Sequence, residues 1–270
     1  MSAIACSIVV LILAFLVRES ASALVDVGPL RLLTDPGWHP SSEPGEFSLA
    51  PMLIATLVTT LGATSVAVVV GVLAAVFCRF YAPPALARPF RALVQVMAGI
   101  PSVVYGFWGL ETLVPLVREL APPGPSLLSG ILVLAMMIVP TIALLSLATL
   151  EAVPPALVYG AAALGLSRWA TLRGVVLPET RAGLGVAVVL GAMRAIGETM
   201  AVVMVCGNVA RVPTSLLDPA RTLTANIALE LGYATHAHRS ALFASGLLLT
   251  AIVLALVVAQ ERLSRRARRA

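Results

Sequence analysis

The amino-acid sequence predicts an all-α, polytopic membrane protein with six transmembrane helices. Hydrophobic residues make up 59% of the 270-residue chain and charged residues only 11%, and the mean hydropathy is +0.99. A soluble domain carries about 25% charged residues, so a chain this apolar cannot cover its surface with polar side chains. A spanning helix needs about 20 predominantly apolar residues. The six candidate stretches are Met1–Val17, Pro51–Phe77, Ala92–Val117, Ser126–Leu150, Gly183–Cys206 and Ala241–Ala259.

The first stretch, Met1–Val17, is short and spans only with tilt or with local thinning of the bilayer. The alternative is a signal peptide, because Ala21-Ser22-Ala23 resembles a small-residue cleavage site. The residues before the apolar run include no arginine, which weakens that alternative. We therefore favour a retained helix. In both cases the chain that follows emerges on the outside of the membrane.

Prolines interrupt the third and fourth stretches, at Pro101 and Pro140. A proline inside a helix removes a backbone donor and kinks the helix. Within lipid, the freed carbonyl must be satisfied by a neighbouring helix or by a water-filled cavity. At Pro140 we favour a packing kink. At Pro101 two interpretations stay open: a packing kink, or a passage lined by Ser102 and Tyr105.

All 18 basic residues are arginines, and the chain contains no lysine. This excludes an ATP site of the P-loop type, whose lysine reaches the nucleotide phosphates. It also excludes a protein-kinase site and a Schiff-base lysine. The sequence has no His-Glu-x-x-His motif, and its three cysteines lack the spacing of metal ligands or disulfides. We expect no catalytic residue, no metal site and no bound cofactor.

The distribution of arginines indicates that both termini lie in the cytoplasm. Cytoplasmic loops carry the excess of basic residues, and with the N-terminus inside, eleven arginines are cytoplasmic and six external. We expect the last run of arginines to lie on anionic headgroups, since it is too short for a nucleic-acid-binding domain. The cytoplasmic set is Arg79, Arg88, Arg91, Arg168, Arg173, Arg181, Arg262, Arg265, Arg266, Arg268 and Arg269, and the external set is Arg18, Arg31, Arg118, Arg211, Arg221 and Arg239.

The remaining arginine, Arg194, lies inside the fifth predicted span, four residues before Glu198, so the two side chains would share one helix face. Arg194 follows Gly183 by roughly 16 Å of helix, close to the middle of a hydrocarbon core about 30 Å thick. An arginine at that depth costs roughly 2.5–3.5 kcal/mol on insertion scales. It should therefore be paired and should face protein or water.

Two interpretations of this charged pair stay open. In the first, Glu198 merely neutralises Arg194 in a structural ion pair. In the second, Arg194 forms an anion site, because a guanidinium stays protonated and matches phosphate-like oxyanions. Under this hypothesis Glu198 holds Arg194 when no anion is present and releases it when one arrives. We favour the second interpretation.

A long cytoplasmic loop, Glu151–Ala182, separates the fourth and fifth predicted spans, and a loop of this length suggests a partner. Gly165, followed after nine residues by Val175-Val-Leu177-Pro178, resembles the EAA loop of ABC importer permeases. That loop reads Glu-Ala-Ala, three residues, Gly, nine residues, Ile-x-Leu-Pro. Tyr159 and Gly160 replace its first two residues, and Ala161 matches the third.

The resemblance implies the type I ABC importer permease fold, in which this loop forms a coupling helix that docks on a separate ATPase subunit. By this resemblance, the residues assigned to coupling are Ala161, Gly165, Leu166, Ser167, Arg168, Leu177 and Pro178.

The string Arg194-Ala-Ile-Gly-Glu-Thr-Met-Ala-Val-Val-Met-Val-Cys-Gly-Asn208 resembles the fifth-helix signature of the phosphate permeases called PstC. The sister permeases called PstA share its start but continue differently. Further stretches that resemble the PstC family are Trp38-His-Pro with Gly45-Glu-Phe, Ala98–Gly106 with Trp108-Gly109, and Pro213–Leu216 with Asp218-Pro219 and Arg221–Thr224. The resemblance implies that Arg194, Glu198 and Thr199 act in phosphate translocation.

The PstC resemblance implies a non-catalytic permease subunit of an ATP-driven phosphate importer in the bacterial inner membrane. Its expected partners are a PstB-like ATPase that uses ATP and Mg²⁺, a PstA-like second permease and a PstS-like periplasmic binding protein. Alternatives are a permease for sulfate, molybdate or tungstate, and an ion-coupled secondary transporter. The expected organisation is an N-terminal helix with its external loop over residues 1–50, a permease core over 51–262 with a coupling loop at 151–182, and a basic tail over 263–270.

The external segment Asn208–Ser240 is too long for a simple turn. Thr222–Leu231 is expected to form a short amphipathic helix that lies on the outer face or dips into it. His236 and His238 have no further ligands near them in sequence, whereas a zinc site needs three or four. We expect both histidines to be solvated loop residues.

Overall fold

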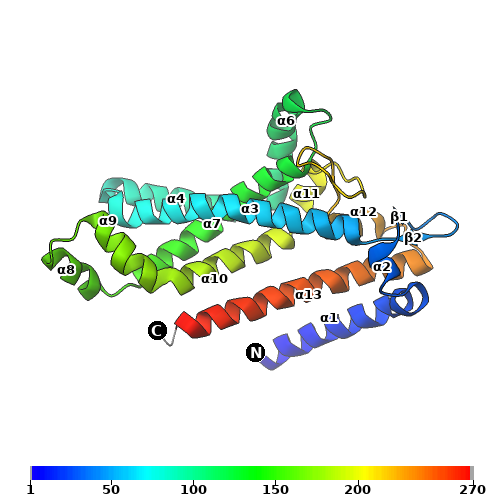
Figure 1. The fold of residues 1–270 in the computed structure, drawn as a ribbon, viewed down its shortest axis with the longest axis horizontal. Helices are drawn as coiled ribbons and strands as arrows, with labels where there is room; N and C mark the ends of the chain where they lie inside the picture. The colour runs from blue at the N-terminus through cyan, green and yellow to red at the C-terminus, as the bar shows by residue number, and fades with distance from the viewer. Residues whose placement is uncertain (1, 268–270) are drawn as a thin grey trace. The chain divides into compact units, whose positions relative to one another are not determined.

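The computed structural model describes residues 2–267, and nearly all of its regular structure is helical (Figure 1). The elements are α1 Ser2–Ser22, α2 Arg31–Thr34, β1 Trp38–His39, β2 Glu46–Phe47, α3 Ala50–Val76, α4 Pro84–Gly99, α5 Ser102–Trp108, α6 Val114–Leu120, α7 Leu127–Glu151, α8 Pro155–Ala163, α9 Arg168–Thr171, α10 Leu177–Ile196, α11 Met200–Val205, α12 Leu223–Glu230 and α13 His236–Ala267.

The chain divides into two compact units. The first unit comprises Met1–Thr60, Ser102–Val133 and Ile196–Leu254, and the second comprises Leu61–Pro101, Leu134–Ala195 and Ala255–Ala270. The long helices α3, α7 and α13 contribute residues to both units.

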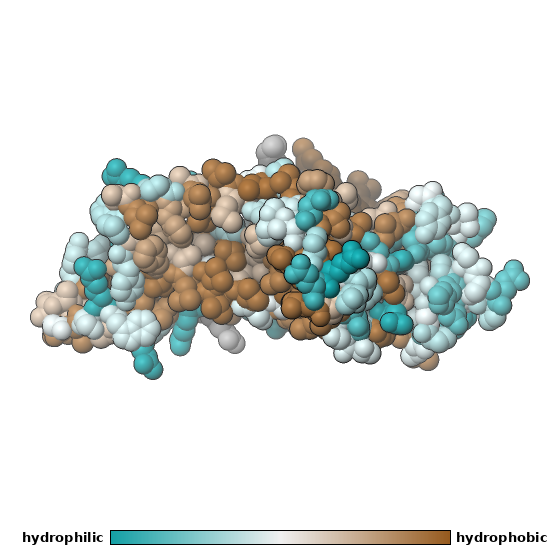
Figure 2. Space-filling view, turned by 90° about the horizontal axis from the view of Figure 1, so that it is seen from above, coloured by the Kyte–Doolittle hydropathy of each residue, from teal (hydrophilic) through white to brown (hydrophobic). Residues whose placement is uncertain are grey.

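Five helical stretches of the described residues are long and apolar enough to cross a membrane, which agrees with the predicted polytopic fold. A sixth span is reached if α4 and α5–α6 together form one interrupted crossing. Figure 2 shows apolar side chains covering much of one face, as expected of helices that contact lipid. The five stretches are Cys6–Val27, Ala50–Tyr81, Leu127–Glu151, Arg168–Ile196 and His236–Arg265.

Four short π-helical turns share a cause that is visible in the sequence. Each turn ends two residues before a proline. Proline cannot donate to the helical ladder and its ring clashes with the carbonyl four residues earlier, and a π turn widens the helix at that point. The turns are Ala23–Val27, Phe77–Tyr81, Gly109–Leu113 and Leu172–Val176, and the prolines that follow them are Pro29, Pro83, Pro115 and Pro178.

The third predicted span is not one helix, because it ends and restarts at Pro101. Ile100 adopts an extended conformation (φ −65°, ψ 129°) that ends α4, and α5 begins at Ser102. The residue before a proline is pushed away from helical geometry, so this proline breaks the helix where the sequence predicted a kink within it. Pro140 behaves differently, since α7 runs unbroken through it.

The first helix is longer than predicted: α1 and its π turn continue to Val27, past the proposed cleavage site. α1 lies antiparallel to the start of α13 (Figure 1), with the Phe15 and Phe243 rings 5.5 Å apart, edge to face. Ser240 fixes the end of the helix, because its hydroxyl donates to the Glu19 carbonyl and accepts from the Ala23 N–H. Met1, where the predicted span begins, lies outside the described residues.

The first unit has a core in which the N-terminal segment packs against α12 and α13. The two-residue strands β1 and β2 pair antiparallel, with Trp38 opposite Phe47, and both aromatic side chains are buried. These contacts hold the segment between α1 and α3 in place. The core residues are Ala23, Leu32, Trp38, Phe47, Leu49, Met52, Leu223, Ala241, Leu242 and Ala244.

The second unit has its own core, around the end of α3 and the segment from α7 to α10. Leu150, Leu172 and Val176 are almost fully buried there. The predicted loop between the fourth and fifth spans is therefore mostly helical and firmly packed at its base. Of the predicted basic tail, residues 263–267 continue α13, and residues 268–270 lie outside the described part of the chain. The core residues are Ala75, Val76, Cys78, Leu147, Leu150, Val153, Leu172 and Val176.

Candidate functional site

The string Gly197-Glu-Thr199 forms a break between α10 and α11, which corrects the predicted continuous helix Gly183–Cys206. α10 instead begins at Leu177 and ends at Ile196. Arg194 lies in the last turn of α10, and its side chain is exposed. Its depth in the membrane stays a prediction, which was counted from Gly183, whereas α10 begins at Leu177. Because Glu198 lies outside the helix, the two side chains do not share a helical face in the predicted way.

Glu198 uses both its side chain and its backbone at the break. Its Oε1 accepts a hydrogen bond from the Ala201 N–H at 3.2 Å, which satisfies one of the unpaired donors that open α11. Its backbone carbonyl accepts from the Thr224 hydroxyl on α12 at 2.8 Å. Neighbouring Thr199 is the N-cap residue of α11. These hydrogen bonds stabilise the break, and the Glu198 carboxylate at its centre is half-buried.

Small residues allow α11 to pack closely within the first unit. A Cβ placed on Gly106 of α5 would lie 2.8 Å from the Ala201 Cα atom, and one placed on Gly130 of α7 would lie 2.3 Å from the Cys206 Sγ atom. Only glycine fits at these crossings, as at the close helix crossings of membrane proteins generally. The Ala98–Gly106 and Arg194–Asn208 strings singled out in the sequence therefore meet through α5 and α11.

The segment that resembles the EAA loop folds into α8, α9 and the start of α10. Gly165 has a φ of +74°, in the left-handed region that glycine tolerates. The Leu166 N–H donates to the Ala161 carbonyl and the Gly165 N–H to the Ala162 carbonyl. These two bonds form a Schellman motif that ends α8. The positive φ explains why the motif needs glycine at this position.

Capping and proline geometry order the rest of this segment. The Ser167 hydroxyl accepts from the Ala170 N–H at 3.2 Å and so caps α9. The Arg168 guanidinium donates to the Phe80 carbonyl at 3.5 Å, which connects α9 to the turn after α3. Leu177 and Pro178 open α10 directly after the π turn Leu172–Val176.

The outer side of this segment leaves large apolar side chains in solvent. Leu164 is 82% exposed, Tyr159 73% and Trp169 59%. Scattered exposed apolar residues are ordinary, but five large ones within one short segment favour an interaction surface. We call the group the docking face. Its members are Leu157, Tyr159, Leu164, Leu166 and Trp169.

A buried carboxylate cluster in the first unit was not predicted from the sequence. Glu230, at the end of α12, accepts a hydrogen bond from the Trp38 indole N–H at 2.7 Å and lies 2.8 Å from the His238 Nε2 atom. The Arg221 guanidinium donates to its other carboxylate oxygen. His238 is therefore a buried partner of Glu230 at the start of α13, and the prediction that it is a solvated loop residue is wrong.

One sequence signal could have located this cluster. Glu230 is the single acidic residue of an apolar, helix-forming stretch, Leu223–Leu231. A carboxylate on the buried side of a helix requires charged or hydrogen-bonding partners. The predicted helix at Thr222–Leu231 is confirmed as α12, with Thr222 as its N-cap. Leu223, its first residue, is part of the core of the first unit, and its predicted place at the outer face stays a prediction.

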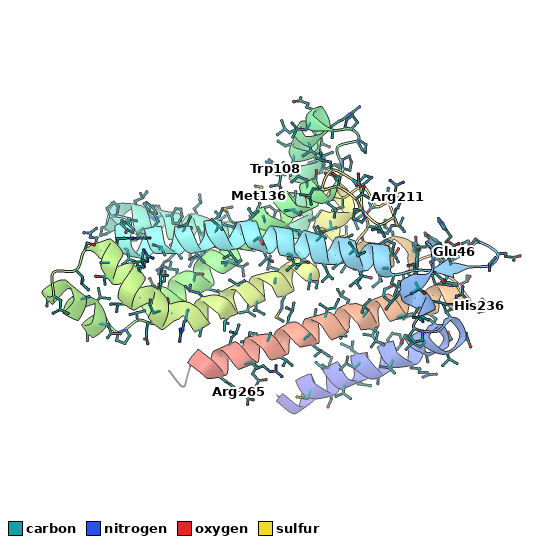
Figure 3. The ribbon with its side chains drawn as sticks, viewed as in Figure 1. Glu46, Trp108, Met136, Arg211, His236 and Arg265 are labelled. Carbon is teal, nitrogen blue, oxygen red and sulfur yellow. The ribbon has the colours of Figure 1, made fainter. Side chains whose placement is uncertain are left out.

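The cluster forms the wall of an open cleft of about 1100 Å³ within the first unit. Arg211, labelled in Figure 3 on the loop after α11, adds a second guanidinium to the lining. Beside that loop, Asp218 accepts hydrogen bonds from the Thr214 hydroxyl and from the Thr214 and Ser215 N–H groups. These donors hold the pKa of the Asp218 carboxyl below its ordinary value.

Known proteins match this chain over most of its length. The family described as "Binding-protein-dependent transport system inner membrane component" matches residues 67–269. The "Probable ABC transporter permease protein YqgH" of Bacillus subtilis is 37% identical over 86% of this chain and 77% of that protein. The "Phosphate transport system permease protein PstC" of Mesorhizobium japonicum is 36% identical over 86% and 78%. The protein of the same name from Haemophilus influenzae is 36% identical over 80% and 74%.

Solved structures share the fold. A chain of the inward-facing MetNI methionine ABC transporter superposes with a TM-score of 0.62 at 23% identity, over 79% of this chain and 93% of that chain. A chain of an amino acid ABC transporter solved with histidines gives a TM-score of 0.55 at 20% identity, over 81% and 92%. At these identities the likeness concerns the fold alone.

Proposed function

Because the chain belongs to the family of binding-protein-dependent transport system inner membrane components, we propose that it moves inorganic phosphate into the cell as a permease subunit. The family makes it a non-catalytic, multi-pass membrane subunit with the fold of a type I ABC importer permease, and ATP hydrolysis belongs to a separate subunit. The observation that carries phosphate as the substrate is the 36% identity with PstC of Mesorhizobium japonicum over 86% of the chain.

The proposed setting is the bacterial cytoplasmic membrane, with both termini inside, as the eleven cytoplasmic arginines indicate. The docking face then lies on the cytoplasmic side, where its exposed Leu164 and Trp169 side chains would enter a groove of a PstB-like ATPase. A PstA-like permease would complete the pathway, and a PstS-like protein would deliver the anion from outside. The chain itself would need no cofactor.

The proposed translocation residues are Arg194, Glu198 and Thr199. Arg194 is exposed at the end of α10, so its guanidinium is available to an oxyanion. Glu198 is committed to the Ala201 N–H, and its loss would loosen the start of α11. Thr199 occupies the N-cap position of α11, and its hydroxyl donates to the Gly197 carbonyl at 3.4 Å, within the same break. Arg194 would attract the anion, and the break at Gly197–Thr199 would be the segment that changes when the pathway opens.

Uptake of radiolabelled phosphate by membrane vesicles that hold the complete complex tests this proposal. We expect Arg194→Ala and Glu198→Gln each to reduce the uptake rate at least about tenfold, the loss of one charge-assisted contact. The matched controls are Arg118→Ala and Glu119→Gln, an exposed pair on α6, which should keep normal uptake. Normal uptake by both test variants at equal membrane expression would refute the assigned roles.

The same vesicles separate the alternative functions. Uptake that requires internal ATP and persists without ion gradients supports an ABC importer. Uptake driven by an ion gradient without ATP would identify a secondary transporter. If excess sulfate or molybdate abolished phosphate uptake, the transported substrate would be another oxyanion. Co-purification of a P-loop ATPase and a second permease with the tagged chain would identify the partners.

A further inference from the structure

A basic pocket in the second unit has no part in the proposed pathway. Its volume is about 290 Å³, and its charged lining consists of Arg79, Arg88, Arg91 and Glu151. Arg79 comes from the π turn after α3, Arg88 and Arg91 from α4, and Glu151 from the last residue of α7. Two neighbouring segments, the π turn Phe77–Tyr81 and α4, thus bring three guanidinium groups to a cavity that the end of α7 also lines.

The charges in the basic pocket do not cancel. Arg91 forms an ion pair with Glu151. Within the described residues 2–267, neither Arg79 nor Arg88 makes an ion pair, and Arg79 lies 5.6 Å from the centre of the Phe80 ring. The pocket therefore keeps two uncompensated positive charges. Guanidinium groups bind phosphate oxygens through paired hydrogen bonds, so an anion of that kind fits the lining.

The surroundings of the basic pocket are those of a membrane surface. The spanning stretches Ala50–Tyr81 and Leu127–Glu151 both end at it. Large apolar side chains are exposed on the same segments, among them Leu73, Phe77 and Tyr81 near the end of α3, and Leu86 and Leu93 on α4. Basic groups above an exposed apolar surface match an anionic lipid, whose phosphate lies beside its acyl chains.

We propose that the basic pocket binds a phosphate group carried by the headgroup of an anionic phospholipid. Arg79 and Arg88 hold the phosphate, and the Arg91–Glu151 pair orders the pocket wall. Free inorganic phosphate presents the same oxygens and is the other source of this chemistry. The pocket also adjoins the segment that resembles the EAA loop, because Arg168 of α9 donates to the carbonyl of Phe80, the residue after Arg79. The site does not depend on the identity of the transported substrate.

Native mass spectrometry of the full chain, with the subunits that co-purify with it, tests the proposal. The probes are dioleoylphosphatidylglycerol, dioleoylphosphatidylcholine and inorganic phosphate, each added to protein in neutral detergent. One arginine near an anionic lipid contributes about fivefold in affinity. We therefore expect Arg79→Gln/Arg88→Gln to weaken phosphatidylglycerol binding about 25-fold. The variant Arg79→Lys/Arg88→Lys keeps both charges and should retain most of the binding.

The control removes the same charge elsewhere: Arg118→Gln/Arg239→Gln, two exposed arginines of the first unit, neither of which lines the basic pocket. This control should change phosphatidylglycerol binding by less than about twofold. Phosphatidylglycerol that stays bound in excess inorganic phosphate identifies the lipid as the ligand, whereas its displacement identifies free phosphate in the same pocket. Equal binding of the two lipids, or an equal loss in the control pair, would overturn the proposal. If the double variant does not fold, Arg88→Gln alone gives the same comparison.

Discussion

The carboxylate cluster of the first unit and the docking face of the second unit differ in whether their side chains have partners within this chain. In the cluster, Glu230 has three partners from three segments, and all of these groups are buried or partly buried. In the docking face, large apolar side chains of α8, of α9 and of the turn between them are exposed. The cluster is complete within one chain, whereas the docking face needs another surface to cover it. Substitutions in the cluster should therefore change stability, and substitutions in the docking face should change assembly.

The largest expected effect is that of Glu230→Ala. Its removal leaves the Arg221 guanidinium and the Trp38 indole N–H without their acceptor in a buried setting. Breaking a buried ion pair in this way costs about 3–5 kcal/mol. Thermal unfolding of the purified protein, read from the exposure of the buried Cys78 and Cys206, should show a large fall in the transition temperature. The docking of an ATPase should be unchanged at temperatures where the variant is folded.

Glu261→Ala is the matched control for Glu230→Ala. Glu261 also pairs with an arginine, Arg265, but its side chain is 58% exposed. An exposed pair of this kind contributes about 0.3–0.5 kcal/mol, so the unfolding transition should hardly move. Equal destabilisation by the two variants would mean that burial of the Glu230 cluster does not determine its contribution.

The second effect concerns assembly. Leu164→Ala/Trp169→Ala removes the two most prominent apolar groups near the turn between α8 and α9. Aromatic anchors of an interface are worth about 2 kcal/mol or more each, so ATPase binding should weaken at least about 30-fold. Binding is measured by titration of the purified ATPase onto the detergent-solubilised chain. The unfolding temperature of the isolated chain should stay unchanged.

An exposed leucine outside the docking face provides the control for this loss. Leu120 ends α6 and is 77% exposed. Leu120→Ala should leave ATPase binding intact. Retained binding in Leu164→Ala/Trp169→Ala would show that the partner covers a different surface, and the docking face would then need another explanation.

The third effect is smaller and compares two glycines near the docking face, Gly165 and Gly160. Gly165 ends α8 with a φ of +74°, so Gly165→Ala should cost about 1–2 kcal/mol in local stability. Gly160, inside α8, has no heavy atom within 4 Å of an added Cβ, and Gly160→Ala should stabilise the helix by up to about 1 kcal/mol. Hydrogen–deuterium exchange of α8 should move in opposite directions in the two variants. The same direction in both would contradict the assigned roles of the glycines.

The sequence predicted those parts of the molecule that depend on neighbouring residues. The apolar runs located α3, α7 and α13, and the spacing of Gly165, Leu177 and Pro178 located the segment that resembles the EAA loop. The break at Ile100 was partly visible, since Pro101 was recognised but its effect on the preceding residue was underestimated.

Other features depend on contacts between distant residues and could not be derived from local pattern. Gly197-Glu-Thr199 lies in a continuous apolar run, and its unwinding is held by Thr224, 26 residues from the Glu198 carbonyl that it contacts. Trp38 and Glu230 are 192 residues apart. His238 has a polar sequence context, so only the fold places it against Glu230.

The smallest expected effect is a dependence on pH at Asp218, in the loop after α11. Hydrogen bonds from the Thr214 hydroxyl, and from the Thr214 and Ser215 N–H groups, lower the pKa of this carboxyl. The folded loop therefore binds a proton less readily than the unfolded chain, whose aspartate pKa is about 3.9. The stabilisation is fully present above that value, and it is lost as the pH falls through the lower pKa of the folded loop.

Hydrogen–deuterium exchange of the Thr214 and Ser215 amides measures this effect, with Asp218→Asn as the comparison. At neutral pH the amides of the unmodified chain should exchange more slowly than those of the variant, because a carboxylate accepts hydrogen bonds more strongly than an amide oxygen does. The difference should shrink as the pH falls through the lowered pKa of Asp218, since protonation removes the charge that Asp218→Asn also lacks. Because the Asp218 carboxylate accepts from Thr214 and Ser215 of the same loop, the change should stay within this loop and leave the Glu230 cluster and the unfolding temperature unaltered. A difference in exchange that does not change with pH would mean that the shape of the Asp218 side chain, and not its charge, orders the loop.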